Sequence, residues 1–119
     1  MVKADAYGLG ADRIATALAH AGCRDFFVAT IAEAVALREI VAERIYVLSG
    51  PLSSAEVAEF GRASVTPVLN SAEQANWWRE AGDSPAALHV DTGMERLGFD
   101  WRKPDALPND LQVDLLMTH

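Results

Sequence analysis

The first residues of the chain carry an amine, a carboxylate and a phenol at alternate positions. The run from Val2 to Tyr7 predicts a strand, which would place Lys3, Asp5 and Tyr7 on one face. A lysine ammonium is costly to bury without a partner and tends to lose its proton, and the neutral amine is a nucleophile toward aldehydes. Lys3 is therefore a candidate for Schiff-base chemistry. The alternative from spacing alone is an ion pair between Lys3 and Asp5 at a solvated strand end.

Two glycines after this run invite comparison with a dinucleotide-binding loop. Gly8 and Gly10 have the first spacing of that fingerprint, but position 13, where its third glycine belongs, is Arg13. We expect these glycines to form a tight turn into a helix instead. The run 91–93 also predicts a turn, in which Asp91 bonds to amides of its own loop.

Six short apolar runs must position these residues, and each is read as a strand. Helical patterns lie between them, so the expected sheet is parallel, either a section of an α/β barrel or an open doubly wound sheet. One stretch, 100–110, predicts a long irregular connection. The predicted strands are Val2 to Tyr7, Asp25 to Thr30, Ile45 to Ser49, Val65 to Leu69, Ala86 to Val90 and Val113 to Thr118.

Local signals mark where the intervening helices begin and end. A hydroxyl residue followed three positions later by a carboxylate or amide predicts a capping box, and a glycine after an apolar stretch predicts a helix end. We expect Trp77 and Trp78 to pack in a core or an interface. The predicted boxes are Thr30–Glu33, Ser53–Glu56 and Ser71–Gln74, and the predicted ends are Gly22, Gly61 and Gly82.

Composition narrows the class of protein and its partners. Half of the 119 residues are apolar and 23% are charged, which is typical of a chain that buries a core. The net charge of -7, without a Lys/Arg cluster, argues against nucleic-acid and membrane-surface partners. No run is long enough for a membrane span and no signal peptide is recognised, so we expect a cytoplasmic protein. Cys23, the single cysteine, is expected to be a small buried side chain, and no metal-ligand spacing occurs.

Two segments together resemble the signatures of one enzyme family. Positions 2–10, VKADAYGLG, look like the pyridoxal-phosphate lysine motif of alanine racemases, and positions 89–98, HVDTGMERLG, resemble that family's second signature. The runs 27–30, 66–71 and 117–119 are also similar to the racemase barrel. The resemblance thus covers essentially the whole chain.

The resemblance implies a fold and an activity. The fold would be a partial (β/α)8 TIM-type barrel with about six parallel strands. Residues 1–119 would form a single incomplete domain without strands seven and eight or the C-terminal β domain. The activity would be the interconversion of L-alanine and D-alanine, which supplies D-alanine for peptidoglycan, with pyridoxal 5'-phosphate as cofactor. The full-length enzyme is expected to be a homodimer.

The roles of individual residues follow from the same resemblance. Lys3 matches the lysine that binds the cofactor covalently and acts as one acid/base group at the substrate Cα. Tyr7 matches the tyrosine whose hydroxyl reaches the cofactor phosphate. Arg96 matches the arginine near the cofactor's phenolic oxygen and the substrate carboxylate, and His119 matches a histidine beside the cofactor ring. No metal is implied.

The sequence departs from the family at two positions. His89 stands where many members carry a lysine, often carbamylated, whose charge helps to hold the arginine matched by Arg96. An imidazole cannot supply that negative charge, so Glu95 or a bound chloride is the expected substitute. Leu9 replaces a frequent histidine and is expected to matter less. The family's second base is a tyrosine of the partner subunit, from the domain lacking here, so we expect the isolated chain to be inactive or nearly so.

Two other readings stay open. The chain could be a pyridoxal-phosphate binding module or another enzyme of the same cofactor fold type, such as a decarboxylase or aldolase. It could also be a non-catalytic remnant that pairs its open strand edges with itself or with a partner.

Overall fold

The structure is a computed structural model that describes residues 1–82 and 84–119. Helices and strands alternate along most of the chain. In order they are α1 (Lys3–Gly8), α2 (Ala11–His20), β1 (Asp25–Val28), α3 (Ile31–Arg38), β2 (Arg44–Val47), the 3-10 turn η1 (Ser54–Glu56), α4 (Val57–Ala63), β3 (Thr66–Leu69), α5 (Ala72–Ala81), β4 (Ala86–Asp91), β5 (Phe99–Asp100), the 3-10 turn η2 (Pro104–Ala106) and β6 (Val113–Met117).

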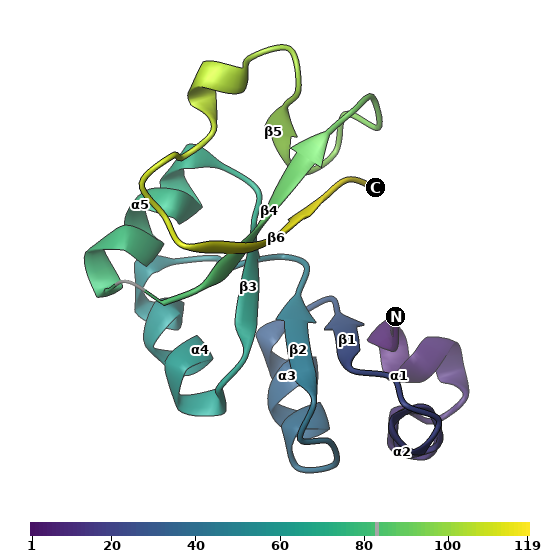
Figure 1. Cartoon of the computed structure of the whole chain (residues 1–119). Coiled ribbons are helices and arrows are strands. Elements are labelled where there is room, and N and C mark those ends of the chain that lie inside the picture. Colours follow the sequence, from purple (N-terminus) through teal and green to yellow (C-terminus); the bar gives the residue numbers. More distant parts are fainter. Residues whose placement is uncertain (83) are drawn as a thin grey trace.

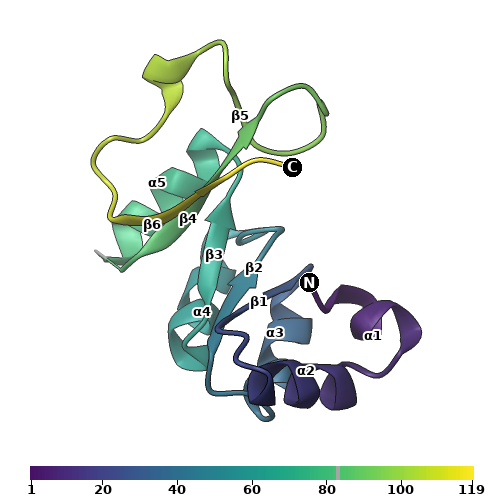
Figure 2. The ribbon, with the colours of Figure 1, turned by 45° about the vertical axis from the view of Figure 1, so that its right-hand side comes forward.

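The strands form one twisted parallel sheet. Their order is β1-β2-β3-β4-β5, with β6 also paired to β4, and all five strand pairings are parallel. The sheet curves strongly from β1 to β6 (Figures 1 and 2). This confirms the expected α/β fold built on six parallel strands, and it brings the carboxyl ends of the strands to one edge.

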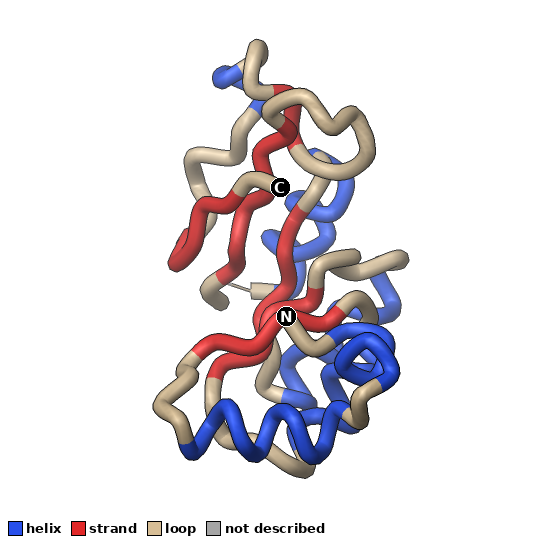
Figure 3. Tube along the Cα trace, turned by 90° about the vertical axis from the view of Figure 1, so that its right-hand side faces the viewer, coloured by secondary structure: helices blue, strands red, loops and turns tan. Residues whose placement is uncertain are grey.

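Side chains alternate between two apolar layers on the two faces of the sheet. Helices α3, α4 and α5 cover one face (Figures 1 and 3), and the larger core lies between them and the strands, with Ile45 and Phe60 fully buried. On the other face a smaller cluster forms around Tyr46, Val68 and Ala87. The Tyr46 ring stacks on Phe27, with 4.9 Å between ring centroids.

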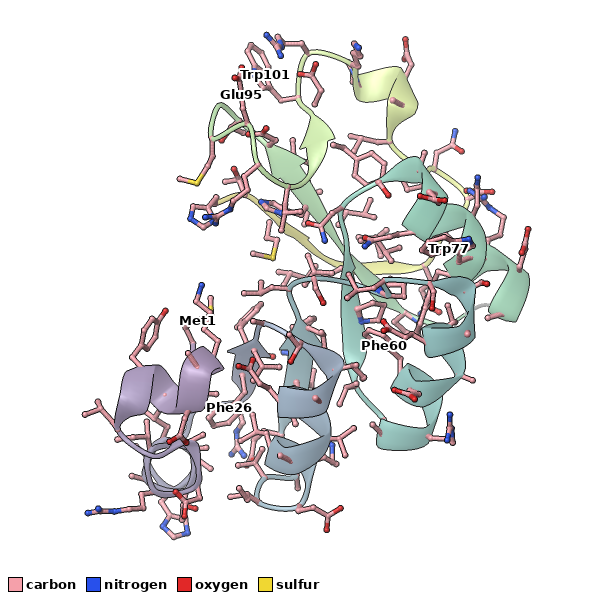
Figure 4. The ribbon with its side chains drawn as sticks, turned by 180° about the vertical axis from the view of Figure 1, so that it is seen from behind. Met1, Phe26, Phe60, Trp77, Glu95 and Trp101 are labelled. Atoms are coloured by element: carbon pink, nitrogen blue, oxygen red, sulfur yellow. The ribbon has the colours of Figure 1, made fainter. Side chains whose placement is uncertain are left out.

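The tryptophans of α5 pack as expected. Trp78 is buried, meets Phe60 edge-on at 5.9 Å and donates from its indole N–H to the Ser84 carbonyl. Trp77 is half-buried and packs against the same core; Figure 4 shows it on the helical side of the molecule, with Phe60. Cys23 is half-buried rather than fully buried, and its thiol lies 3.3 Å from the Asp25 carbonyl oxygen.

The predicted first strand is wrong. Residues Val2 to Tyr7 are not extended: four consecutive residues, 4–7, have left-handed backbone angles with φ between 52° and 57°. Only the Val2 amide bonds to β1, at the Phe27 carbonyl oxygen (2.9 Å). The segment satisfies its amides within a left-handed turn instead, so Lys3 and Tyr7 do not share a strand face.

The helix signals are confirmed unevenly. The capping box at Thr30 is complete, with both reciprocal bonds to Glu33. Ser71 accepts from the Gln74 amide, but the Gln74 side chain bonds elsewhere. The predicted box at Ser53 is absent: the Ser53 side chain makes no capping bond, and the Glu56 carboxylate accepts from the Leu52 amide rather than from the Ser53 amide.

The predicted helix ends divide in the same way. Gly22 follows α2 and Gly82 caps α5, both at positive φ. Gly61 lies inside α4, which ends two residues later with Ser64 in the left-handed cap position. That prediction is wrong, because a serine takes the conformation that glycine was expected to supply.

The connection from β4 to β6 is largely irregular, as predicted, but it contains a strand that the sequence did not reveal. Two-residue β5 continues the β4 ladder at Val90 and Asp91, and η2 follows it. No α-helix lies between β4 and β6 in this fully described stretch. In the part of the chain that the structure describes, none of the helices combines the length and apolar character required to cross a membrane.

Candidate functional site

A pocket of about 500 Å³ opens at the carboxyl ends of the strands. This is the edge where α/β barrels carry their active sites, and the volume is in the range of small-molecule sites. Three of the four residues predicted for the site line it, each from a different part of the chain. The polar side chains of its wall are those of Lys3, Thr30, Ser49, His89, Arg96, Thr118 and His119.

The backbone of Lys3 is held in place by bonds from the residues before and after it. Before it, Val2 is buried and bonded to β1. After it, the Ala4 amide donates to the Glu33 carboxylate (2.9 Å). The other oxygen of Glu33 accepts from the amides of Ala29 (2.7 Å) and Thr30 (3.3 Å), so one carboxylate joins the lysine segment to the end of β1 and the start of α3.

The left-handed turn after Lys3 closes on itself. The Ala6 amide donates to the Val2 carbonyl, and the Gly10 amide donates to the Asp5 carbonyl, both at 3.0 Å. The Asp5 carboxylate accepts from the Ala11 amide at 2.7 Å. Asp5 thus secures the turn into α2. Among the described residues, Asp5 and Lys3 do not form the ion pair that was the alternative prediction.

Arg96 lies on a loop that is organised by a turn at Asp91. One oxygen of this carboxylate accepts from the amides of Gly93 (2.9 Å) and Glu95 (3.1 Å), and these bonds lower the pKa of Asp91. The turn prediction for this loop is confirmed. Glu95 itself has φ of 55° and projects from the loop end away from α1 (Figure 4), and it does not line the pocket.

Arg96 and His119 face each other across the pocket mouth. One guanidinium nitrogen of Arg96 lies 3.5 Å from each ring nitrogen of His119. A neutral imidazole accepts at only one of its two ring nitrogens, and a guanidinium nitrogen equally far from both is not aligned with that lone pair, so neither contact is a strong hydrogen bond. Both side chains are exposed, so the two weak contacts do not define the direction of the guanidinium.

Behind this mouth lies a buried polar network. His89 is buried, and its Nδ1 lies 2.8 Å from the Oδ1 of Asn70, which is also buried. The Asn70 amide nitrogen donates to the Leu48 and Val68 carbonyls. The Gln74 side chain extends the network. Its nitrogen donates to the Ser49 and Pro51 carbonyls, and its oxygen accepts from the backbone N–H of Asn70.

Tyr7 is the predicted site residue that the structure does not bring to the pocket. Its side chain is 64% exposed and lies on the outside of the left-handed turn. The described residues contain no cluster of three metal-ligating side chains. The roles of Glu33, Asn70 and Gln74 at the site were not predicted, although the helix-start pattern already drew attention to Glu33 and Gln74.

Comparison with known proteins agrees with the motifs. The family described as "Alanine racemase, N-terminal domain" matches residues 1–119. The chain is 52% identical to the biosynthetic alanine racemase of Agrobacterium fabrum over 104 residues, and 47% identical to the alanine racemase of Rhodospirillum rubrum over 132 residues. These alignments cover 83% and 100% of this chain, but only 26% and 35% of the relatives.

Solved structures give the same result. Alanine racemase from Bartonella henselae, with covalently bound pyridoxal phosphate, has a TM-score of 0.83 and 36% identity, over 99% of this chain and 38% of that one. For the enzyme from E. faecalis the TM-score is 0.85, with 28% identity over 99% and 35% of the chains. By sequence and by fold, the chain belongs to the alanine racemase N-terminal domain family.

Proposed function

We propose that this chain forms the lysine-bearing part of a pyridoxal 5'-phosphate-dependent racemase that interconverts L-alanine and D-alanine. The observation that carries the proposal is the convergence of Lys3, Arg96 and His119 on one pocket at the carboxyl edge of the sheet. The Lys3 segment and the Arg96 loop are the two signatures of the family, and they lie far apart in the sequence.

The pocket suits an anionic aromatic aldehyde. Lys3 supplies an amine that can hold the aldehyde carbon, Arg96 supplies a permanent positive charge, and the His119 ring offers a flat wall. Loop hydroxyls of Thr30 and Ser49 add hydrogen-bonding groups at the same edge. When bound, the cofactor spreads the negative charge that remains after the substrate loses its Cα proton.

The chain's own residues have two tasks in this reaction. Once free, the Lys3 amine takes or returns the Cα proton on one face of the substrate. The planar, always charged guanidinium of Arg96 suits bidentate contact with the substrate carboxylate. The Glu33 carboxylate serves the first task, because it fixes the backbone on the C-terminal side of Lys3. We also place the Tyr7 hydroxyl near the cofactor phosphate, although Tyr7 is exposed in this structure.

The proposal assigns the remaining functions to parts beyond this chain. The base for the opposite face would come from the partner subunit of a homodimer, so the isolated 119 residues would show little or no racemisation. Residues 1–119 would be one incomplete barrel domain. A small free amino acid as substrate agrees with a cytoplasmic location.

Covalent trapping tests the central assignment. The chain has two lysines, Lys3 and Lys103, and Lys103 is exposed and outside the pocket. The chain is mixed with pyridoxal 5'-phosphate and reduced with borohydride, and the modified residue is then mapped by fragment mass spectrometry. We expect the label on Lys3 in the wild type and in Lys103→Arg, and none at the pocket in Lys3→Arg.

The mapping must also separate the Met1 α-amine, since Met1 lines the same pocket. A label confined to Met1 or Lys103 would contradict the assignment of Lys3. Absence of any label would favour the non-catalytic alternative. Racemisation of alanine by a longer polypeptide that contains this chain, and its loss in Lys3→Arg, would distinguish a racemase from a decarboxylase or aldolase.

A further inference from the structure

The orientation of the Asn70 amide is fixed by its neighbours. Its nitrogen donates to the carbonyl oxygens of Leu48 (2.9 Å) and Val68 (2.8 Å), which can only accept. Reversing the amide would set oxygen against oxygen at both contacts. The Asn70 Oδ1 therefore faces the His89 ring.

This orientation selects the tautomer of His89. The His89 Nδ1 lies 2.8 Å from Asn70 Oδ1, and an amide oxygen cannot donate. The proton of a neutral His89 ring must therefore be on Nδ1. The other nitrogen, Nε2, then carries a lone pair and acts as an acceptor.

The acceptor is buried and has no protein partner. His89 is 6% exposed, and Nε2 makes no hydrogen bond among the described residues. A buried polar atom without a partner is destabilising, so a donor at this point would be favourable. The pocket wall that contains His89 also contains Arg96, whose guanidinium has donors to spare and only weak contacts with His119.

We propose that His89 is a positioning residue: held by Asn70 in the Nδ1–H form, it accepts a hydrogen bond at Nε2 from the guanidinium of Arg96 and so orients that side chain in the pocket. No negative charge is needed for this contact, because a neutral acceptor is sufficient for a charged donor. The expectation that Glu95 or a chloride must replace the family's carbamylated lysine is then unnecessary. The consequence for catalysis rests on the proposed function.

The electrostatic surroundings favour the neutral ring. Burial, His119 and Arg96 lower the pKa of His89, and only Asp91 acts in the opposite direction. A second proton on His89 would place an N–H at Nε2, directed at a pocket that already holds a guanidinium. The neutral form is the one that can accept.

The tautomer is tested on the ¹⁵N-labelled chain without any ligand. Two-bond nitrogen–proton spectra at pH 8 separate protonated from unprotonated ring nitrogens. We expect His89 to show a protonated Nδ1 and an unprotonated Nε2, while exposed His20 shows exchange between both forms. A protonated Nε2 in neutral His89 would overturn the proposal. Because no cofactor is involved, this result is independent of the Lys3 labelling.

The contact is tested by removing the donor. We expect Arg96→Gln to shift the His89 Nε2 resonance toward that of an unbonded ring nitrogen. The matched control is Arg102→Gln, since exposed Arg102 pairs with Asp100 and does not line the pocket; it should leave His89 unchanged. Both substitutions lie on exposed loops, so the fold is not at risk. An Nε2 resonance that does not respond to Arg96→Gln, or responds equally to both, would overturn the role.

A second pair of variants separates positioning from packing. His89→Gln can return an amide oxygen to the place of Nε2, whereas His89→Asn keeps a polar group toward Asn70 and removes the acceptor from the pocket. We expect the Arg96 guanidinium protons to exchange with water slowly in the wild type and in His89→Gln, and rapidly in His89→Asn. Equal exchange in the two variants would contradict an orienting acceptor at this position.

Discussion

The two segments that bring positive charge to the pocket are built differently. Both the Lys3 segment and the Arg96 loop contain non-glycine residues at positive φ, and both are held by one carboxylate. Glu33 is on another element, 29 positions from the amide of Ala4 that it accepts from. Asp91 is only two to four positions from the amides that it holds.

This difference separates tertiary positioning from local positioning. The direction of Lys3 depends on β1 and α3 being packed, because Glu33 reaches the lysine segment only in the folded protein. The Arg96 loop can form its turn without those elements, and its arginine remains exposed. We infer that the core fixes the backbone that carries the Lys3 amine, whereas the guanidinium is adjustable and needs a further contact to define it.

The largest expected effect comes from removing the tertiary anchor. Glu33→Ala leaves three backbone amides without their charged acceptor, which should lower the free energy of unfolding by about 3 to 5 kcal/mol. Urea denaturation measures this loss, and trapping of the cofactor at Lys3 should fall with it. Exposed Glu39, at the other end of α3, is the matched control: Glu39→Ala should change stability by less than about 0.5 kcal/mol.

A close backbone approach should give the next largest effect. Gly98 has φ of 108°, and a Cβ there would lie 2.8 Å from the Asp91 nitrogen and 2.9 Å from the His89 carbonyl oxygen. Gly98→Ala should therefore lower the unfolding free energy by about 2 to 3 kcal/mol. Gly93, in the same loop at φ of 139°, has open space around a Cβ, so Gly93→Ala should cost about 1 kcal/mol. Equal losses in thermal denaturation would show that the loop is not anchored at Gly98.

Removal of the local carboxylate should have a smaller effect. Asp91→Ala should release the turn around Gly93 without unfolding the sheet, as measured by faster amide exchange at Gly93 and Glu95 and unchanged exchange in β2. Similar acceleration in β2 would contradict a purely local role.

The pH dependence of stability should distinguish Asp91 from the buried His89. The folded-state pKa of each is lowered, so the unfolded state binds protons more readily and stability falls with decreasing pH. For His89 the decline begins as pH falls through the ordinary value of 6.5, and for Asp91 only below 3.8. His89→Gln should abolish the first decline, in urea titrations at each pH. Asp91→Asn should reduce the second decline without abolishing it, because ion pairs with arginines also lower the pKa values of Asp100 and Asp110.

The smallest effect on the fold is expected at Tyr7. Because its side chain is 64% exposed, Tyr7→Phe should change the unfolding free energy by less than about 0.5 kcal/mol. Under the proposed function, the same change should weaken retention of pyridoxal 5'-phosphate, measured by its release on dialysis. Retention equal to the wild type would contradict the phosphate contact proposed for Tyr7.

Apolar runs in the sequence predicted the parts of the fold that are set by burial. The strands near Phe26, Ile45 and Val68 are continuous apolar runs covered on both faces, and their positions are predictable for that reason. The prediction of a strand at Lys3 was wrong because alternation of residue types is also compatible with a turn. Only the carboxylate of Glu33, which is distant in the sequence, decides between strand and turn. Two-residue β5 is too short to produce a pattern.

The candidate site was predictable from its motifs but not from its contacts. The motifs predicted Lys3 and Arg96 as site residues from the chemistry of their side chains, and the structure places both at one pocket. They could not show that Asn70 selects the tautomer of His89. The two residues are 19 positions apart in the sequence and meet only because β3 and β4 are neighbours in the sheet. Side-chain networks between strands leave little trace in a single sequence.

The left-handed turn at residues 4–7 has a consequence for how the protein matures. Each non-glycine residue in this conformation costs about 1 to 2 kcal/mol, so the isolated peptide would abandon it. During synthesis the amine leaves the ribosome long before Glu33 does, and until that glutamate emerges the nascent lysine has no defined direction. Under the proposed function, capture of the vitamin-derived aldehyde in its working orientation is therefore a late event, after the neighbouring layers have closed.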